Sequence, residues 1–322
     1  MPAAFRAFLT ALVDYAGLFP PAALDLAPAI RNHLGYREGA DAWMLGRFIV
    51  PGGRLGDLDA FADEIAASGA DGPGADGPVT LSVLGLREAG GLVETAHATL
   101  AAAREAEARH GGALRCDRFE LRAAPEAAGR IAALADMPLA EGDGIAVELP
   151  MTGEGYARAA VEEGAHAVAE ANARTGRQAF ALKLRCGGVT PDLVPGVEPL
   201  AHAVAACRSA GAPFKATAGL HHPVRHYNEG AGMTMHGFIN LFGGAALALA
   251  HGLGADDIAE VLDETDPARF HLADDLAWRG LRVAAPRVHE ARQRLALSYG
   301  SCSFDEPRED LQALGWMPAT VT

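Results

Sequence analysis

The stretches FALKLRCGG (residues 180–188) and FKATAGLHHP (residues 214–223) decide the fold that the sequence predicts. Each has the length and apolar content of a buried β-strand, and a helical segment connects them. Side chains alternate between the two faces of a strand, so Lys183 and Arg185 share one face, and Lys215 falls on the equivalent face of the second strand. Because burying unpaired charges is costly, these cations indicate either internal ion pairs or a chemical task.

Six further segments have strand character and alternate with helical segments. They are residues 13–19, 43–51, 79–85, 118–124, 144–150 and 237–244. Eight strands alternating with helices are typical of the α/β fold known as the (β/α)8 or TIM barrel. The alternative is an open doubly wound sheet, but the turn at residues 17–20 lacks the glycine-rich sequence that such a sheet uses after its first strand.

We expect two regions along the chain. The barrel should occupy residues 1–254, and residues 255–322 should add extra C-terminal helices that pack on it, with a loop at residues 298–307. This extension either covers one end of the barrel or forms a contact in a homo-oligomer, and the sequence leaves both open.

Composition restricts the partners and the compartment. The chain has 322 residues and a net charge of −14, so its surface should repel nucleic acid and anionic membranes. No apolar run reaches the roughly 18 residues of a membrane span. The four cysteines form no C-x-x-C pair, and the first residues lack the basic region of a signal peptide. We therefore expect a cytoplasmic protein with reduced thiols, no nucleic-acid partner and no membrane contact.

The predicted interior of the barrel is basic although the whole chain is acidic. The inward positions hold the cations Arg47, Arg122, Lys183, Arg185 and Lys215, the anions Glu120 and Glu148 with Asp14 as a further candidate, and the neutral groups Thr80, Ser82, Thr217 and Asn240. The surplus of positive charge predicts a small anionic substrate, either a phosphate ester or a carboxylate. A balanced internal network is the alternative for some of these residues. The candidate substrate contacts are Arg47, Arg122, Arg185, Thr217 and Asn240.

Gly243 and Gly244 follow the expected eighth strand and open a helix. Backbone N–H groups at a helix start can hold a phosphate, and barrels often use the loops after strands seven and eight for this purpose. A plain strand-to-helix turn is the alternative for the same two residues.

The lysines suggest covalent chemistry. A lysine becomes a nucleophile when burial or a second cation lowers its pKa, and Lys183 has Arg185 and Lys215 nearby. Together with the run KATAGLHHPVR (residues 215–225), this layout resembles class I aldolases of the barrel type, most closely the deoxyribose-phosphate aldolase family. That family carries a Schiff-base lysine on strand six and a second lysine on strand seven, in a Lys-Ala-Ser-Gly-Gly-like run.

The resemblance implies that Lys183 forms the Schiff base, that Lys215 lowers the pKa of Lys183, and that no cofactor is needed. It covers these two strands, and KLRCGG (residues 183–188) stands where the family has a Lys-Thr-Ser-Thr-Gly run. As a whole the chain also resembles bacterial (β/α)8-barrel proteins.

Other residues complete the predicted site. Glu148, on the neighbouring strand, is the candidate general acid/base. Cys186 lies beside cations that could lower the pKa of its thiol, although a packed thiol is the commoner case. His221 and His222 are candidate acid/base groups or anion contacts.

Three hypotheses remain open. The first is a Schiff-base lyase or aldolase that acts on a small phosphorylated or carboxylated carbonyl compound. The second is a metal-dependent hydrolase or isomerase that uses the cluster of His221, His222, His226 and His236 with Glu148, although no fixed set of metal ligands is visible. The third is a non-catalytic barrel that binds an anion.

Overall fold

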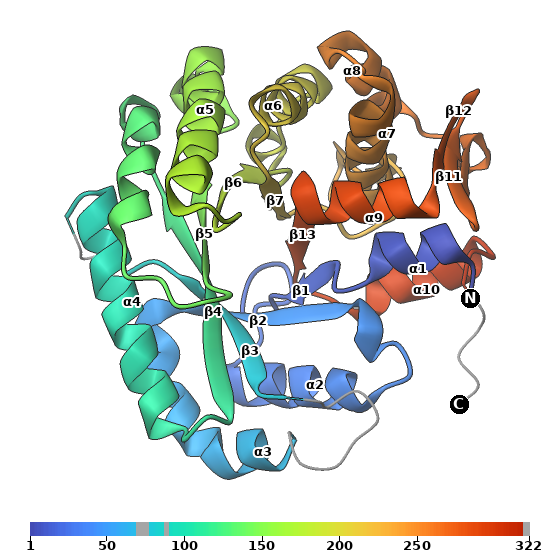
Figure 1. Ribbon diagram of the computed structural model, residues 1–322. Coiled ribbons are helices and arrows are strands. Elements are labelled where there is room, and N and C mark those ends of the chain that lie inside the picture. The colour runs from blue at the N-terminus through green and yellow to red at the C-terminus, as the bar shows by residue number, and fades with distance from the viewer. Residues whose placement is uncertain (69–76, 87–89, 318–322) are drawn as a thin grey trace.

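Eight parallel strands form a closed barrel in the computed structural model, which describes residues 1–68, 77–86 and 90–317 (Figure 1). The strands are β1 (Val13–Tyr15), β2 (Leu45–Pro51), β3 (Val79–Leu84), β4 (Leu114–Arg122), β5 (Gly144–Glu148), β6 (Phe180–Arg185), β7 (Phe214–Thr217) and β13 (Ala296–Ser301). β1 to β7 follow one another around the barrel, and β13 closes it between β7 and β1. The predicted (β/α)8 fold is confirmed.

Helices surround the barrel. They are α1 (Ala3–Leu9), α2 (Leu26–Glu38), α3 (Ala62–Ala67), α4 (Leu92–Arg109), α5 (Arg158–Thr175), α6 (Val197–Ala210), α7 (Gly244–His251), α8 (Ala255–Asp263), α9 (Ala285–Arg294) and α10 (Asp305–Ala313). Helical turns of other types fill several connections: η1 (Ala42–Met44), η2 (Gly52–Phe61), η3 (Pro125–Asp136), η4 (Gly153–Gly155), η5 (Pro191–Leu193), η6 (Ile239–Gly243) and η7 (Pro267–Arg269). α5 and α6 end at Gly176 and Gly211, whose positive φ values of 66° and 70° suit glycine.

The eighth strand is not where the sequence predicts it. Residues 238–244 are helical: η6 is a short π-helix that runs directly into α7. The barrel is closed instead by β13, whose residues 298–301 lie in the segment expected to be a loop at residues 298–307. Residues 255–322, expected to lie outside the barrel, therefore supply one of its strands.

Two small sheets lie outside the barrel. One is formed by β10 (Phe270–Leu272), β11 (Asp275–Trp278) and β12 (Leu281–Ala284), and the other by β8 (His226–Asn228) and β9 (Met233–Met235). The sequence pattern predicts neither. No helix in the part of the chain that the structure describes has the length and apolar character of a membrane span.

The barrel has two different ends. We call the C-terminal ends of its strands the mouth and the N-terminal ends the floor. α1 and α9 pack side by side and approach the floor, because each leads into the start of a barrel strand (Figure 1). Apolar side chains fill the layer between strands and helices, whereas the barrel interior holds buried polar groups: Asp14, Ser82, Glu120, Glu148, Lys183, Lys215 and Ser298.

Candidate active site

Two lysines and three carboxylates form a continuous ion-pair network inside the barrel. Lys183 on β6 and Lys215 on β7 are register partners. The Nζ atom of Lys183 lies 2.9 Å from Glu120 and 2.7 Å from Glu148. The Nζ atom of Lys215 lies 2.9 Å from the other oxygen of Glu120 and also pairs with Asp14. Glu120 therefore bridges the two ammonium groups.

Neighbouring groups fix the two deepest carboxylates. Ser82 donates a hydrogen bond of 2.5 Å to Glu120, and Ser298 on β13 donates one of 2.8 Å to Asp14. The backbone N–H of Arg47 donates to the second oxygen of Asp14 at 2.7 Å. Gly46 is required here, since a Cβ atom at this position would lie 2.2 Å from that same oxygen. The strand sequence thus shapes the pocket for the Asp14 carboxylate.

The electrostatics of this network correct one expectation. Burial disfavours the charged form of Lys183, but Glu120 and Glu148 outweigh burial and raise its pKa above the ordinary value. The resemblance implied the opposite, a pKa lowered by Lys215. Burial also opposes ionisation of Asp14 and Glu120, yet the adjacent lysines hold the pKa of both carboxyls below their ordinary values. Lys183 has too many carboxylate neighbours to act as a free amine in this state.

Three of the predicted substrate contacts lie at the mouth. Arg185 pairs with Glu148 at 2.9 Å, and Arg122 lies 3.7 Å from the same carboxylate oxygen. The side chain of Arg122 is 66% exposed and that of Arg185 is 27% exposed, so both can reach a ligand. Thr217 is the register partner of Arg185 on β7. Glu148 thus joins the buried lysines to the arginines at the mouth.

The histidines after β7 contact α10. The Nδ1 atom of His221 lies 2.8 Å from Glu306 and 3.9 Å from the sulfur of Cys302. Burial lowers the pKa of His221, but the contacts with Cys302 and Glu306 outweigh it and raise the pKa to about 9. His222 pairs with Asp310. Within residues 1–68, 77–86 and 90–317, no group of three or more His, Cys, Asp or Glu side chains is arranged to hold a metal ion.

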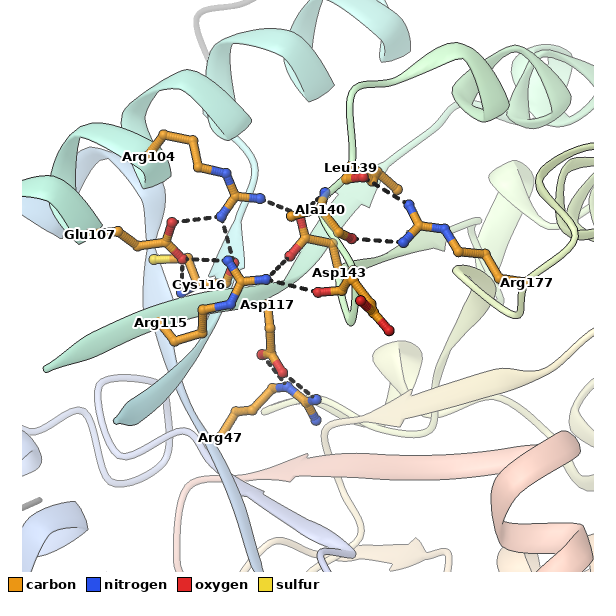
Figure 2. Close-up of polar contacts among 11 residues, drawn as sticks. Arg47, Arg104, Glu107, Arg115, Cys116, Asp117, Leu139, Ala140, Asp143 and Arg177 are labelled. Atoms are coloured by element: carbon orange, nitrogen blue, oxygen red, sulfur yellow. Dashed lines mark hydrogen bonds and ion pairs between the residues drawn. The ribbon is translucent and has the colours of Figure 1, made fainter. Parts of the chain in front are cut away.

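Arg47 lies far down the barrel, near the floor. Its guanidinium makes a bidentate pair with Asp117 at 2.6 and 2.8 Å (Figure 2). Arg47 stands near the start of β2, whereas Arg185 ends β6, so the structure does not bring these two predicted anion contacts together.

Three other predicted contacts and one thiol are buried. Asn240 is buried, donates to the carbonyls of Val261 and Glu264 at 2.8 Å each, and accepts from the Arg225 N–H. Gly243 and Gly244 lie inside a continuous buried helix, so their N–H groups do not form an open helix start. Burial raises the pKa of Cys186 to about 12, which is the reverse of the activation expected for this thiol.

The sequence holds a signal that the strand analysis overlooks. Lys183 and Lys215 are the only two lysines in the chain, among 27 lysine and arginine residues. Every other permanent side-chain cation is an arginine, which stays protonated under almost all conditions, whereas a lysine amine can lose its proton. Glu306, Asp310 and Cys302 escaped notice for a different reason, because the region that holds them was expected to lie outside the barrel.

Comparisons with known proteins add little to this geometry. No protein-family model matches the chain, and no curated protein matches it. Among solved structures it is similar to a deoxyribose phosphate aldolase from Aeropyrum pernix, whose structure is described as a unique tetramer, with 12% identity and a TM-score of 0.47 over 96% of this chain and 93% of that chain. It is also similar to malate synthase from Haloferax volcanii in a magnesium/glyoxylate complex. That match has 12% identity and a TM-score of 0.37, and it covers 77% of this chain and 73% of the malate synthase chain. Likenesses this low carry no argument about activity, and the barrel assignment rests on the strand order of the chain itself.

Proposed function

We propose that the chain is an enzyme that forms a Schiff base between Lys183 and a small anionic carbonyl compound, and acts as a lyase of the aldolase type. One observation carries the proposal: the only two lysines of the chain are buried side by side in the barrel and share one carboxylate. Arginine would satisfy the same carboxylates with more hydrogen bonds, so lysine at both positions favours a task that needs an amine.

Lys183 is the better candidate for the nucleophile. It is 6% exposed and borders Glu148, which is paired with the arginines of the mouth, whereas Lys215 is 1% exposed and lies against Asp14. A substrate that enters from the mouth meets Lys183 first. Lys215 then serves to hold Glu120 in its ionised form beside Lys183.

The mechanism begins with a proton transfer, because Lys183 is held as an ammonium. Glu148, 2.7 Å from its Nζ atom, accepts a proton, and the freed amine attacks the carbonyl carbon. Glu148 then returns that proton to the hydroxyl group of the resulting carbinolamine, and the hydroxyl group leaves as water. The nitrogen keeps its new bond to carbon, so the product is a protonated imine. In a substrate with a β-hydroxyl group, this cation accepts the electron pair of the bond between the α- and β-carbons, which breaks to leave an enamine on Lys183. The β-hydroxyl group loses its proton to the Glu148 carboxylate and becomes the carbonyl of the released fragment.

Arg185 and Arg122 would hold the anionic group of the substrate. In the present structure both arginines face Glu148. A substrate anion would compete for them, and Glu148 would then lose two positive neighbours. This loss makes Glu148 a stronger base at the moment when substrate is bound.

The test is intact-mass analysis after borohydride reduction, with a panel of phosphorylated aldehydes, ketones and 2-oxo acids. Only Lys183, Lys215 and the amino terminus can form an imine in this chain. We expect one adduct per chain, which is lost in Lys183→Met and kept in Lys215→Met. The Glu148→Gln variant should form the same adduct more slowly, by roughly 10²-fold or more if the carboxylate is the general base.

The double variant Lys183→Met/Lys215→Met is the matched control, and circular dichroism of each variant confirms that it folds. An adduct that survives in the double variant lies on the amino terminus and contradicts the proposal. Loss of the adduct in Lys215→Met alone would move the nucleophile to β7. Saturable binding of panel members without any adduct would favour the non-catalytic anion-binding barrel.

A further inference from the structure

A cavity of about 260 Å³ lies at the floor of the barrel, at the opposite end from the proposed active site. We call it the floor cavity. Its lining includes Arg47, Arg118, Lys215, His289, Arg292 and Gln293, and Thr10 and Ser298 add hydroxyl groups. Most of the remaining wall is alanine. Among the residues that the structure describes, no carboxylate lines it. Its volume is slightly below the roughly 300–1,000 Å³ of typical ligand pockets, which suits a small ligand.

Arg118 is the central residue of this cavity. It is partly buried on β4, and its guanidinium has no hydrogen bond or ion pair with any group in residues 1–68, 77–86 and 90–317. Its position is built into the strand sequence, since a Cβ atom at Gly144 would lie 1.8 Å from an Arg118 nitrogen. The glycine at the start of β5 leaves room for the guanidinium to extend across the inside of the barrel.

Arg292 is a second guanidinium without a carboxylate partner. It is buried at the end of α9 and donates only to backbone carbonyls, those of Phe8, Thr10, Ala296 and Leu297. These bonds join α1 to the start of β13, and Asp14 offsets only part of the cost of burying the charge.

Several other arginines near the floor are paired with acids. Arg104 and Arg115 both pair with Glu107 and Asp143, as Figure 2 shows. Of the three arginines that line the floor cavity, Arg47 pairs with Asp117. The other two, Arg118 and Arg292, have no ion pair with a carboxylate in the part of the chain that the structure describes.

The charge around the cavity is out of balance. The nearest carboxylates inside the barrel, Asp14 and Glu120, already serve Lys215 and Lys183. Burial, together with Arg47, lowers the pKa of Arg118 to about 10, although Asp117, Asp14 and Glu120 act in the opposite direction. Burial lowers the pKa of Arg292 to about 9 against the effect of Asp14. Because the compensation of both charges is incomplete, an anion that binds between them would stabilise the folded chain.

We propose that the floor cavity binds a phosphate-type dianion, either free or as the terminal group of a small molecule, between Arg118 and Arg292. The Arg118 guanidinium offers paired donors that match phosphate oxygens, and Arg292 adds a positive charge with the one N–H that its backbone contacts leave over. His289 and Gln293 are exposed on α9 and line the cavity, so a ligand can enter past them. The site lies at the other end of the barrel from the mouth and shares only Lys215 with the ion-pair network. Phosphate binding there does not depend on the proposed lyase activity.

The test is calorimetric titration with inorganic phosphate at constant ionic strength, with chloride as the replaced anion. We expect one saturable site in the wild type and binding at least tenfold weaker in Arg118→Met, which keeps the bulk of the side chain and removes the charge. Arg130→Met, at an exposed position of η3, is the matched control and should bind like the wild type. Without phosphate, Arg118→Met should melt at a higher temperature than the wild type, because an incompletely compensated charge is gone.

A second variant leaves every cation in place. Gln293→Trp enlarges an exposed residue at the cavity entrance and should weaken phosphate binding without lowering the melting temperature. Arg185→Met separates this site from the mouth and should leave the phosphate site intact. Absence of saturable binding in the wild type, loss of binding in Arg185→Met alone, or full binding in both Arg118→Met and Gln293→Trp would overturn the proposal.

Discussion

At the scale of single residues, His221 shows how one contact sets a pH dependence. Its imidazole lies between Glu306 and Cys302, and its pKa is raised to about 9 from an ordinary value of 6.5. A group whose pKa is raised by folding stabilises the folded state fully below its unfolded pKa. That stabilisation is lost as the pH rises through the folded pKa. The window for this pair therefore runs from about 6.5 to about 9.

We predict that Glu306→Gln lowers the pKa of His221 and removes part of this stabilisation. The free energy of unfolding of the wild type should exceed that of the variant at pH 6, and the difference should shrink as the pH rises past about 9. Denaturant unfolding at several pH values measures the difference, and NMR titration of the imidazole measures the pKa. Glu309→Gln, at an exposed position on the same helix, is the control. A wild-type His221 that titrates near 6.5 would contradict the prediction.

The sequence predicts some parts of the site and not others. Strand alternation correctly places Glu120, Lys183 and Lys215 inside the barrel, because that pattern depends only on local geometry. Strand alternation does not predict which carboxylate pairs with which lysine. The carboxylate surplus around Lys183, and hence its raised pKa, follows from the pairing across β4, β5, β6 and β7. Arg118 was missed because the predicted strand began at it, although β4 begins four residues earlier.

At the scale of elements, seven of the eight barrel strands are predicted, and the eighth is not. GFINLFGG (residues 237–244) is apolar and resembles a strand, but its residues 238–244 form a buried helix. β13 has the sequence ALSYGS and resembles a loop because it contains serine and glycine. Inside this barrel small polar residues are required: Ser298 bonds Asp14, and a Cβ atom at Gly300 would lie 2.8 Å from Ile49. An apolar pattern therefore does not identify a strand such as β13, because the interior of this barrel is polar.

Two glycines, one just after a strand and one inside a helix, should change the stability in opposite directions when each is replaced by alanine. A Cβ atom at Gly187, just after β6, would lie 2.7 Å from the Cα atom of Gly219. We predict that Gly187→Ala lowers the free energy of unfolding by about 1–3 kcal/mol, because two backbones must separate. Gly35 is exposed within α2 and has no atom within 4 Å of its Cβ position, so Gly35→Ala should raise stability by about 1 kcal/mol.

Urea unfolding of the two variants beside the wild type measures both effects. The pair controls for the general effect of glycine replacement on the unfolded chain, which has the same sign at both positions. If Gly187→Ala were as stable as Gly35→Ala, the close approach of the two loops after β6 and β7 would not exist in solution.

At the scale of the whole molecule, the barrel depends on the last quarter of the chain. β13 pairs with β1 on one side and with β7 on the other. Its Tyr299 packs on the rings of Phe238 and Phe242, at centroid distances of 5.6 and 5.8 Å. Without β13, two strand edges and these apolar rings would meet water, and Asp14 would lose its bond from Ser298.

We predict that a chain ending at residue 254, the boundary expected from the sequence, does not fold by itself. It should show no cooperative thermal transition and should bind a hydrophobic dye, whereas the full chain should unfold in a single step. Calorimetry and dye fluorescence measure these properties. Addition of a separate peptide of residues 255–322 should restore part of the transition, because the lost contacts are those of β13 with its two neighbours. Cooperative unfolding of the shortened chain alone would mean that seven strands suffice, and that β13 closes a barrel that is already stable.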